Sequence, residues 1–178
     1  MNQGDIDTQW FAVRARHTAR AMAVLEPLCA EVFFPREKIV VPGKKPRMKA
    51  LIPHVLFIRS SRQEALEIER LSHRENSIVT EPIWIYRYPN DTAVQEISPA
   101  SINLLRMLAE SDAGRCEIFN KQNFKPKERV RITGGIYEGY TGHVQRVKKN
   151  LHVIVRIEGV CLVMLPFIHP DLLEKIQD

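Results

Sequence analysis

The chain has 178 residues, 44% of them hydrophobic, and a formal net charge of +5. This length accommodates one or two domains of about 100–150 residues each, with enough apolar side chains for a real core. No run of about 18 apolar residues occurs and the N-terminus lacks a basic-then-apolar signal, so we expect neither a membrane-spanning helix nor a membrane partner.

The chain has three widely spaced cysteines: Cys29, Cys116 and Cys161. An odd number at these distances fits neither a disulfide framework nor a zinc site. We therefore expect buried or half-buried thiols in a reducing, cytoplasmic compartment.

The charge is distributed unevenly along the chain. Residues 10–62 carry 11 Lys/Arg against 3 Asp/Glu, a local net charge of 11 − 3 = +8, whereas residues 63–120 hold an excess of acids. A basic surface of this kind can follow nucleic-acid phosphates, although charge alone favours an ordinary solvated surface. The basic tip at Lys44, Lys45 and Arg47 could meet nucleic acid or no partner, and we favour no partner.

Hydrophobic periodicity predicts the order β-α-β-β-α-β-α in the N-terminal part, with a strand pair at the sixth place. In chain order the elements are strand 10–16, helix 18–28, strands 30–41 and 48–59, helix 62–72, a strand pair within 77–88, and helix 99–110. Runs that mix strands with helices in this order predict an α+β sandwich. Residues 111–123 show no period and are expected to form a linker.

Local signals mark several of these elements. Thr18 is expected to cap the first helix, and Ser61 with Glu64 forms a capping box before the second. Ser98 is expected to cap the third helix, with a proline at its first position. Pro53 inside the strand 48–59 suggests an edge strand or a bulge.

The C-terminal part, residues 124–178, consists of short alternating strands around a glycine-spaced turn. Gly135, Gly139 and Gly142 can supply positive φ angles or a close backbone approach at that turn. Several short strands in a stretch of this length predict a small barrel. A phosphate-binding glycine loop is rejected, because no Lys-Ser/Thr follows and the turn leads into a strand.

Two stretches resemble the NusG-type transcription elongation factors, and the resemblance covers nearly the whole chain. The N-terminal match rests on Trp10-Phe11-Ala12-Val13, the basic helix start and Leu51–Ile58. The second match is the spacing of a KOW motif from Phe124 to Phe167. The resemblance implies an N-terminal NGN-type α/β sandwich at 1–110, a linker at 111–123 and an all-β SH3-like barrel with a KOW motif at 124–178.

The resemblance also implies a function. In the family the N-terminal domain docks on the clamp coiled coil of RNA polymerase, suppresses pausing and promotes read-through of long operons. Non-template DNA and, through the barrel, a ribosomal protein are implied partners, and no cofactor is implied.

The chain departs from the general factor at three places. Ile136 stands where the family has proline, and Leu51-Ile52 replaces paired aromatic residues. Glu158 follows Ile157 where the general factor has an aromatic residue that helps to contact termination factor Rho and a ribosomal protein, which counts against both contacts. These departures resemble a specialised antiterminator of the kind that serves surface or capsular polysaccharide operons.

Motif positions in the family identify candidate site residues in this chain. Those for polymerase binding are Arg14, Ile52, Val55 and Phe57. Those for nucleic-acid binding are Arg16, His17, Arg20 and Arg74. Those at the KOW turn, for a partner, are Gly135, Tyr137, Gly139, Tyr140, Gly142 and Phe167.

Polymerase docking requires an exposed apolar patch, yet alternation alone does not identify the exposed face of strand 48–59. Val55 and Phe57 share one face; Ile52, Leu56 and Ile58 share the other. Either set could be ordinary core. Tyr137 and Tyr140 could likewise stack on RNA, contact a partner protein or belong to the barrel core.

An enzyme is not expected. The six histidines are scattered without metal-ligand spacing, and neither a nucleophile elbow nor a paired-carboxylate motif occurs. The main alternative function is a ribosome-associated RNA-binding KOW protein, which would bind RNA through the barrel alone.

Overall fold

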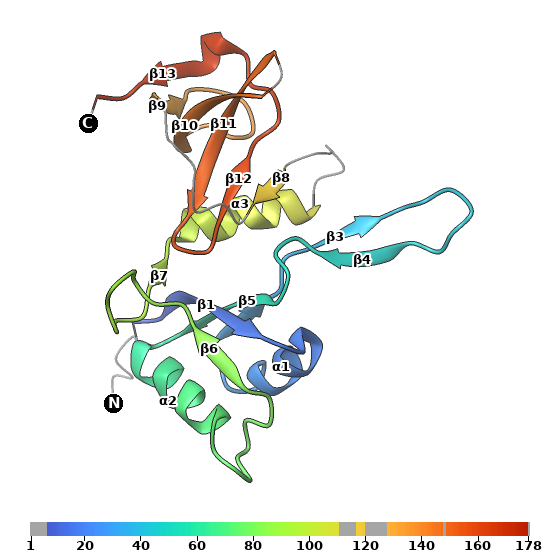
Figure 1. The fold of residues 1–178 in the computed structure, drawn as a ribbon, viewed down its shortest axis with the longest axis vertical. Coiled ribbons are helices and arrows are strands. Elements are labelled where there is room, and N and C mark those ends of the chain that lie inside the picture. Colours follow the sequence, from blue (N-terminus) through green and yellow to red (C-terminus); the bar gives the residue numbers. More distant parts are fainter. Residues whose placement is uncertain (1–6, 111–116, 120–127, 148, 178) are drawn as a thin grey trace, which may run out of the picture. The chain divides into compact units, whose positions relative to one another are not determined.

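The chain divides into two compact units, residues 1–110 and 111–178 (Figure 1). The computed structural model describes residues 7–110, 117–119, 128–147 and 149–177. All three α-helices in these ranges lie in the first unit, and the second contains strands and one 3-10 turn. A mixed α/β first unit followed by an all-β second unit confirms the coarse fold prediction.

The N-terminal unit is built around a five-stranded antiparallel sheet. Its strands are β1 (Gln9–Ala15), β2 (Glu31–Phe33), β5 (Val55–Ser60), β6 (Ile83–Ile85) and β7 (Glu96–Ile97). Their order is β2-β5-β1-β6, and β7 also pairs with β1. Strand β5 therefore lies in the interior of the sheet, and the expectation of an edge strand there is wrong, because Pro53 precedes the strand.

Helices α1 (Thr18–Leu25) and α2 (Arg62–Ser72) cover one face of this sheet (Figure 1). Alternate residues of the strands supply the sheet side of the core, and the helices supply the other side. The cluster includes Phe11, Val13, Ala15, Leu56 and Ile58 from strands, and Ala21, Leu25, Ala65 and Ile68 from helices. Burial of each large side chain stabilises the unit by about 1.5–3 kcal/mol before entropy is counted.

Helix α3 (Pro99–Glu110) reaches the opposite face of the sheet through Arg106. The guanidinium carbon of Arg106 lies 4.6 Å from the ring centroid of Phe33 and 5.8 Å from that of Trp10. The same side chain forms an ion pair with Glu31 of β2. The ring of Phe57 lies 6.2 Å from that of Phe33, so this second face is also packed.

Two of the three predicted helix caps are present. Ser61 and Glu64 form the reciprocal capping box of α2, and the Ser98 hydroxyl accepts the Ser101 N–H at 3.2 Å. The prediction for α1 is wrong, because Thr18 is already helical and the cap position belongs to His17. The helix also ends at Leu25, before Pro27, since proline cannot continue the hydrogen-bond pattern.

The extended segments are shorter than predicted. The predicted strand 48–59 is interrupted by His54, whose φ of 65° lies in the left-handed region. It divides into β4 (Arg47–Ala50) and β5, and β4 pairs instead with β3 (Arg36–Ile39) in a separate two-stranded ribbon (Figure 1). Of the predicted strand pair within 77–88, only β6 is a strand.

The C-terminal unit holds a six-stranded antiparallel sheet in the order β13-β9-β10-β11-β12-β8. The strands are β8 (Glu117–Phe119), β9 (Arg129–Ile132), β10 (Thr141–Val147), β11 (Asn150–Ile157), β12 (Cys161–Met164) and β13 (Leu173–Lys175). Strand β8 lies within residues 111–123 and pairs with β12, so the expectation of a structureless linker is wrong there.

The glycine-spaced turn between β9 and β10 has the geometry expected from the sequence. Gly135 and Gly139 adopt φ angles of 81° and 87°, which side chains disfavour. Gly142 has a different constraint, because a Cβ atom there would lie 2.5 Å from the Ile154 carbonyl oxygen. The turn thus needs glycine for conformation at two positions and for space at a third.

We expect the substitution Gly142→Ala to destabilise the C-terminal unit by about 1–3 kcal/mol, since backbone must move to admit the methyl group. Gly135→Ala is the matched control: nothing lies within 4 Å of its Cβ position, so only the strain of a positive φ, about 1–2 kcal/mol, remains. Urea denaturation of both variants measures the difference. Equal stability of Gly142→Ala and the unchanged chain would contradict the close approach.

Candidate nucleic-acid and polymerase interface

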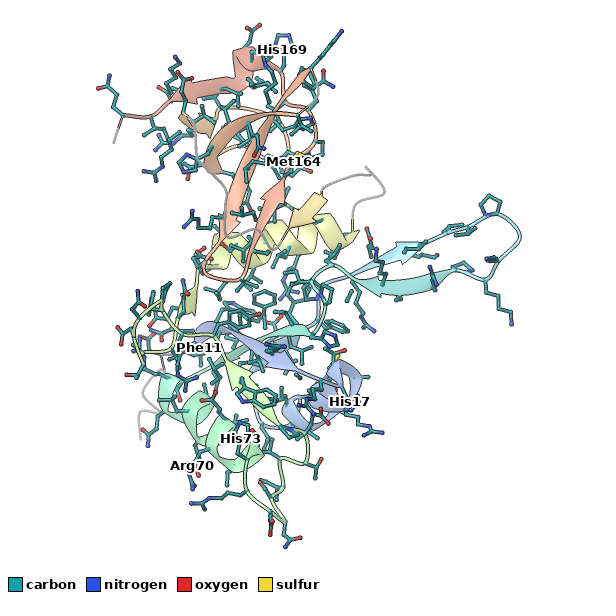
Figure 2. The ribbon with its side chains drawn as sticks, in the orientation of Figure 1. Phe11, His17, Arg70, His73, Met164 and His169 are labelled. Carbon is teal, nitrogen blue, oxygen red and sulfur yellow. The ribbon has the colours of Figure 1, made fainter. Side chains whose placement is uncertain are left out.

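A basic hollow of about 500 Å³ lies at the N-terminal end of α1. Three of the four predicted nucleic-acid residues line it: Arg16, His17 and Arg20. All three side chains are exposed. The end of β1, the first turn of α1 and the segment around Pro53 meet here, so the hollow combines parts of the chain distant in sequence. Figure 2 labels His17 at the start of α1.

The N-terminus of α1 presents its backbone donors to this hollow. The side chain of the N-cap residue His17 makes no capping hydrogen bond, and no acid stands in the first turn of α1. The His17 N–H donates to the buried Glu81 carboxylate at 3.1 Å, which fixes the entry into the helix. The helix dipole favours an anion at this end, where the Glu81 carboxylate already accepts one N–H, and Arg16 and Arg20 add full positive charges.

His54 is a member of the hollow that the sequence did not identify. Its Nδ1 lies 3.2 Å from the Arg16 carbonyl oxygen, and its own carbonyl accepts the Ala15 N–H at 3.0 Å. A carbonyl oxygen only accepts, so Nδ1 is the donor in this contact. The left-handed backbone at His54 brings the ring to this place, and no sequence period signals such a conformation.

Arg74 does not line the hollow. It follows the C-cap His73 of α2, and its N–H donates to the Leu71 carbonyl at 3.1 Å. The side chain is exposed. Its role in nucleic-acid binding stays a prediction.

Three of the four polymerase candidates share one face of the sheet. Arg14 on β1 lies opposite Val55 on β5, and Phe57 lies two residues further along the same strand. Leu56 and Ile58 point into the cluster under α1 and α2, which answers the question that alternation left open. The fourth candidate, Ile52, lies outside the strands and is buried.

The expectation that this face offers an exposed apolar patch at these positions is wrong. Val55 is 2% exposed and Phe57 is 0% exposed. The physical reason is that β5 is an interior strand whose second face packs on Phe33, beneath Arg106. Arg14 is the candidate on this face that remains exposed.

Trp84 adds an exposed aromatic surface beside Arg14. It stands opposite Arg14 on the neighbouring strand β6, and 41% of it is exposed. Its ring centroid lies 5.1 Å from that of His73. The signal in the sequence was a large aromatic residue at the outward position of Ile83-Trp84-Ile85. An exposed tryptophan next to an arginine is typical of protein and nucleic-acid interfaces.

The KOW-turn candidates have different environments. Tyr137 is buried and Tyr140 is half-buried, so Tyr137 has the position of a core residue. Phe167 is 57% exposed and, with Ile136 and Leu172, borders a hollow of about 300 Å³. Exposed apolar side chains gathered around one hollow are typical of a protein-binding surface.

Reactive and metal-binding groups are scarce in the part of the chain that the structure describes. No group of three or more His, Cys, Asp or Glu could hold a metal ion there. Burial raises the pKa of Cys161 to about 12 and, together with Glu64, that of Cys29 to about 11, so both thiols stay protonated at neutral pH. Cys116 lies outside the described residues. Within the described residues, no helix is long and apolar enough to cross a membrane.

No family model matches the chain, and no curated protein matches it either. Among solved structures it is similar to a Thermotoga maritima NusG structure that concerns domain interaction, with 14% identity over 98% of this chain and 100% of that chain and a TM-score of 0.48. It is also similar to a chain of an MjSpt4:Spt5 complex, with 16% identity over 95% of this chain and 97% of that chain and a TM-score of 0.26. At these identities and scores, the residues of the chain itself must carry the functional conclusion.

Proposed function

We propose that this chain is a cytoplasmic transcription elongation factor that binds RNA polymerase, suppresses pausing and acts as an antiterminator of long operons. Its parts would be an NGN-type sandwich and a KOW-bearing SH3-like barrel. The NusG-type resemblance from Trp10 to Phe167 supports this proposal. No cofactor is needed, because the activity consists of binding.

The observation that carries the proposal is the basic hollow at the start of α1. Motif position identifies Arg16, His17 and Arg20 as nucleic-acid contacts, and they line one concave surface at the N-terminus of α1. Phosphate neutralisation by the arginines would hold the factor beside the exposed DNA strand of an elongation complex. Arg14 and Trp84 on the adjoining sheet offer an amphipathic surface to the polymerase clamp.

The proposal is tested by transcription in vitro with purified RNA polymerase on a template with pause sites. The full chain should shorten the pauses. The double variant Arg16→Gln/Arg20→Gln should lose most of that effect, because each arginine that no longer neutralises a phosphate weakens a charge-dependent interaction.

A matched control removes the same charge elsewhere on the unit. Arg62→Gln/Arg70→Gln changes two exposed arginines that form surface ion pairs with Glu96 and Glu67, and such pairs contribute little to stability. This control should suppress pauses as well as the unchanged chain. A chain without any effect on elongation, but with affinity for ribosomal RNA, would instead favour the ribosome-associated alternative.

A further inference from the structure

The two-stranded ribbon of β3 and β4, residues 36–50, carries a concentration of positive charge that the hollow does not include. It contains six Lys/Arg and one acid, Glu37, so its formal net charge is 6 − 1 = +5. The six basic residues are Arg36, Lys38, Lys44, Lys45, Arg47 and Lys49, and all are exposed. For its tip the sequence leaves nucleic acid or no partner open and favours no partner.

The one acid of the ribbon, Glu37, lies directly opposite Lys49 in the pairing of β3 with β4. None of the six basic residues takes part in an ion pair among the residues that the structure describes. Arg36 lies over the ring of Phe34, 5.1 Å from its centroid, which orients that arginine without neutralising it. Elsewhere in the same unit, Arg59, Arg62, Arg70, Arg87 and Arg106 each lie against a glutamate. The ribbon therefore has charge free for an external anion.

The pairing register places this charge on both faces of the ribbon. Arg36 lies opposite Ala50 and Lys38 opposite Met48, whereas Arg47 lies opposite Ile39. Residues directly opposite each other share a face, and neighbours along a strand alternate. Arg36 and Lys38 thus point to one side, and Arg47 and Lys49 point to the other.

We propose that this ribbon is a second nucleic-acid contact, which inserts into a groove of duplex DNA and neutralises phosphates on both sides of it. The major groove is about 12 Å wide and admits a two-stranded ribbon. Charge on two faces suits a groove, because phosphates flank it on two sides. Residues 36–50 contain no aromatic residue on which an unpaired base could stack, which favours a duplex over a single strand.

The ribbon is continuous with the hollow. Ala50, the last residue of β4, is also a lining residue of the hollow at the start of α1. Exposed aliphatic side chains at the tip and on β4, Val40, Val41 and Met48, can contact sugars and thymine methyl groups. This contact rests on the proposed function and extends it, since an elongation factor would then bind duplex DNA next to the exposed strand.

The test measures binding of the full chain to a labelled DNA duplex of about two helical turns at several salt concentrations. In the ribbon variant, Lys38, Lys44, Lys45 and Arg47 are changed to Gln. Its dissociation constant should rise on the order of tenfold, and its salt slope should fall by about 0.9 for each phosphate that the ribbon no longer neutralises. The reduction in affinity should be smaller with the single strand alone.

A charge-matched control separates the effect of the ribbon's charges on DNA binding from the effect of the chain's net charge. Four exposed cations of the C-terminal unit, Arg131, Arg146, Lys149 and Arg156, are changed to Gln in the control. It should keep the salt slope of the unchanged chain. Equal reductions in affinity in both variants would overturn the inference, as would an unchanged slope in the ribbon variant.

The same variants distinguish failure of this inference from failure of the proposed function. If the ribbon variant binds duplex normally but loses affinity for RNA polymerase, the ribbon meets an acidic protein surface and the inference is wrong. If the unchanged chain suppresses no pauses, the proposed function is wrong, whatever the ribbon binds.

Discussion

The substitution Phe57→Asp unfolds the N-terminal unit. Phe57 is 0% exposed in the interior strand β5, with Ala12 of β1 on one side and Phe33 of β2 on the other. An ionised carboxylate without a partner costs several kcal/mol at such a site, and domains are stable by only about 5–15 kcal/mol. All described α-helices lie in this unit, so the far-UV circular dichroism signal of helix should collapse.

The control for this experiment is Phe57→Leu, which keeps an apolar side chain. It should remain folded, with a loss of about 1–2 kcal/mol from imperfect packing. The opposite outcome is informative as well. A Phe57→Asp chain that keeps its helices and melts normally, yet fails to bind polymerase, would show that the ring belongs to an accessible docking face and not to the core.

The second large effect is expected at Glu69, which links α2 to β6. Its carboxylate accepts the Ile85 N–H at 2.8 Å and two Arg87 donors, at 3.0 and 2.6 Å. Glu69→Ala leaves the Ile85 N–H and Arg87 without that partner, so we expect a loss of about 2–3 kcal/mol in the free energy of unfolding. Glu67→Ala on the same helix removes an exposed pair with Arg70 and should change stability by less than about 1 kcal/mol.

The pH dependence of this effect follows from the pKa of Glu69. Burial raises that pKa, but the hydrogen bonds from Arg87 and the Ile85 N–H outweigh burial and hold it below its usual value of 4.5. A depressed folded pKa means that the stabilisation is present above the unfolded pKa and disappears as pH falls through the folded pKa. The stability gap between the unchanged chain and Glu69→Ala should therefore be constant near neutral pH and narrow below about pH 4.5. A gap that stays constant down to about pH 2 would contradict this account of Glu69.

Helices α2 and α3 could be predicted from the sequence almost to the residue. Their determinants are local: a 3.6-residue apolar period, the Ser61–Glu64 capping box and the Ser98 cap. The first helix was predicted less well. Its cap position belongs to His17, which makes no side-chain capping bond and therefore leaves no signature in the sequence.

The strands were harder to predict because pairing defines them, and the partners are distant in sequence. The run from residue 48 to residue 59 looked like one strand, but the left-handed backbone at His54 divides it between two sheets. Strand β5 is buried on both faces, so alternation could not identify an outer face. Strand β8 has no period of its own, and its pairing with β12 makes it a strand.

In the candidate site, too, local signals could be predicted from the sequence and tertiary packing could not. Motif position identified Arg16, His17 and Arg20, and tertiary structure then brought them together with His54. Contributions that depend on packing were not predictable: the exposure of Trp84 beside Arg14, and the two charged faces of the ribbon, which depend on the register of β3 and β4.

The central claim is that this chain acts on RNA polymerase through its N-terminal unit. The most direct test immobilises the tagged full chain and offers it core RNA polymerase and, separately, ribosomes. We expect polymerase to be retained. Arg14→Gln with Trp84→Ala should reduce this retention on the order of tenfold, as expected for two side chains at the centre of an interface. The control Arg70→Gln should leave retention unchanged. Retention of ribosomes and not of polymerase, or retention of polymerase that ignores Arg14 and Trp84, would contradict the account.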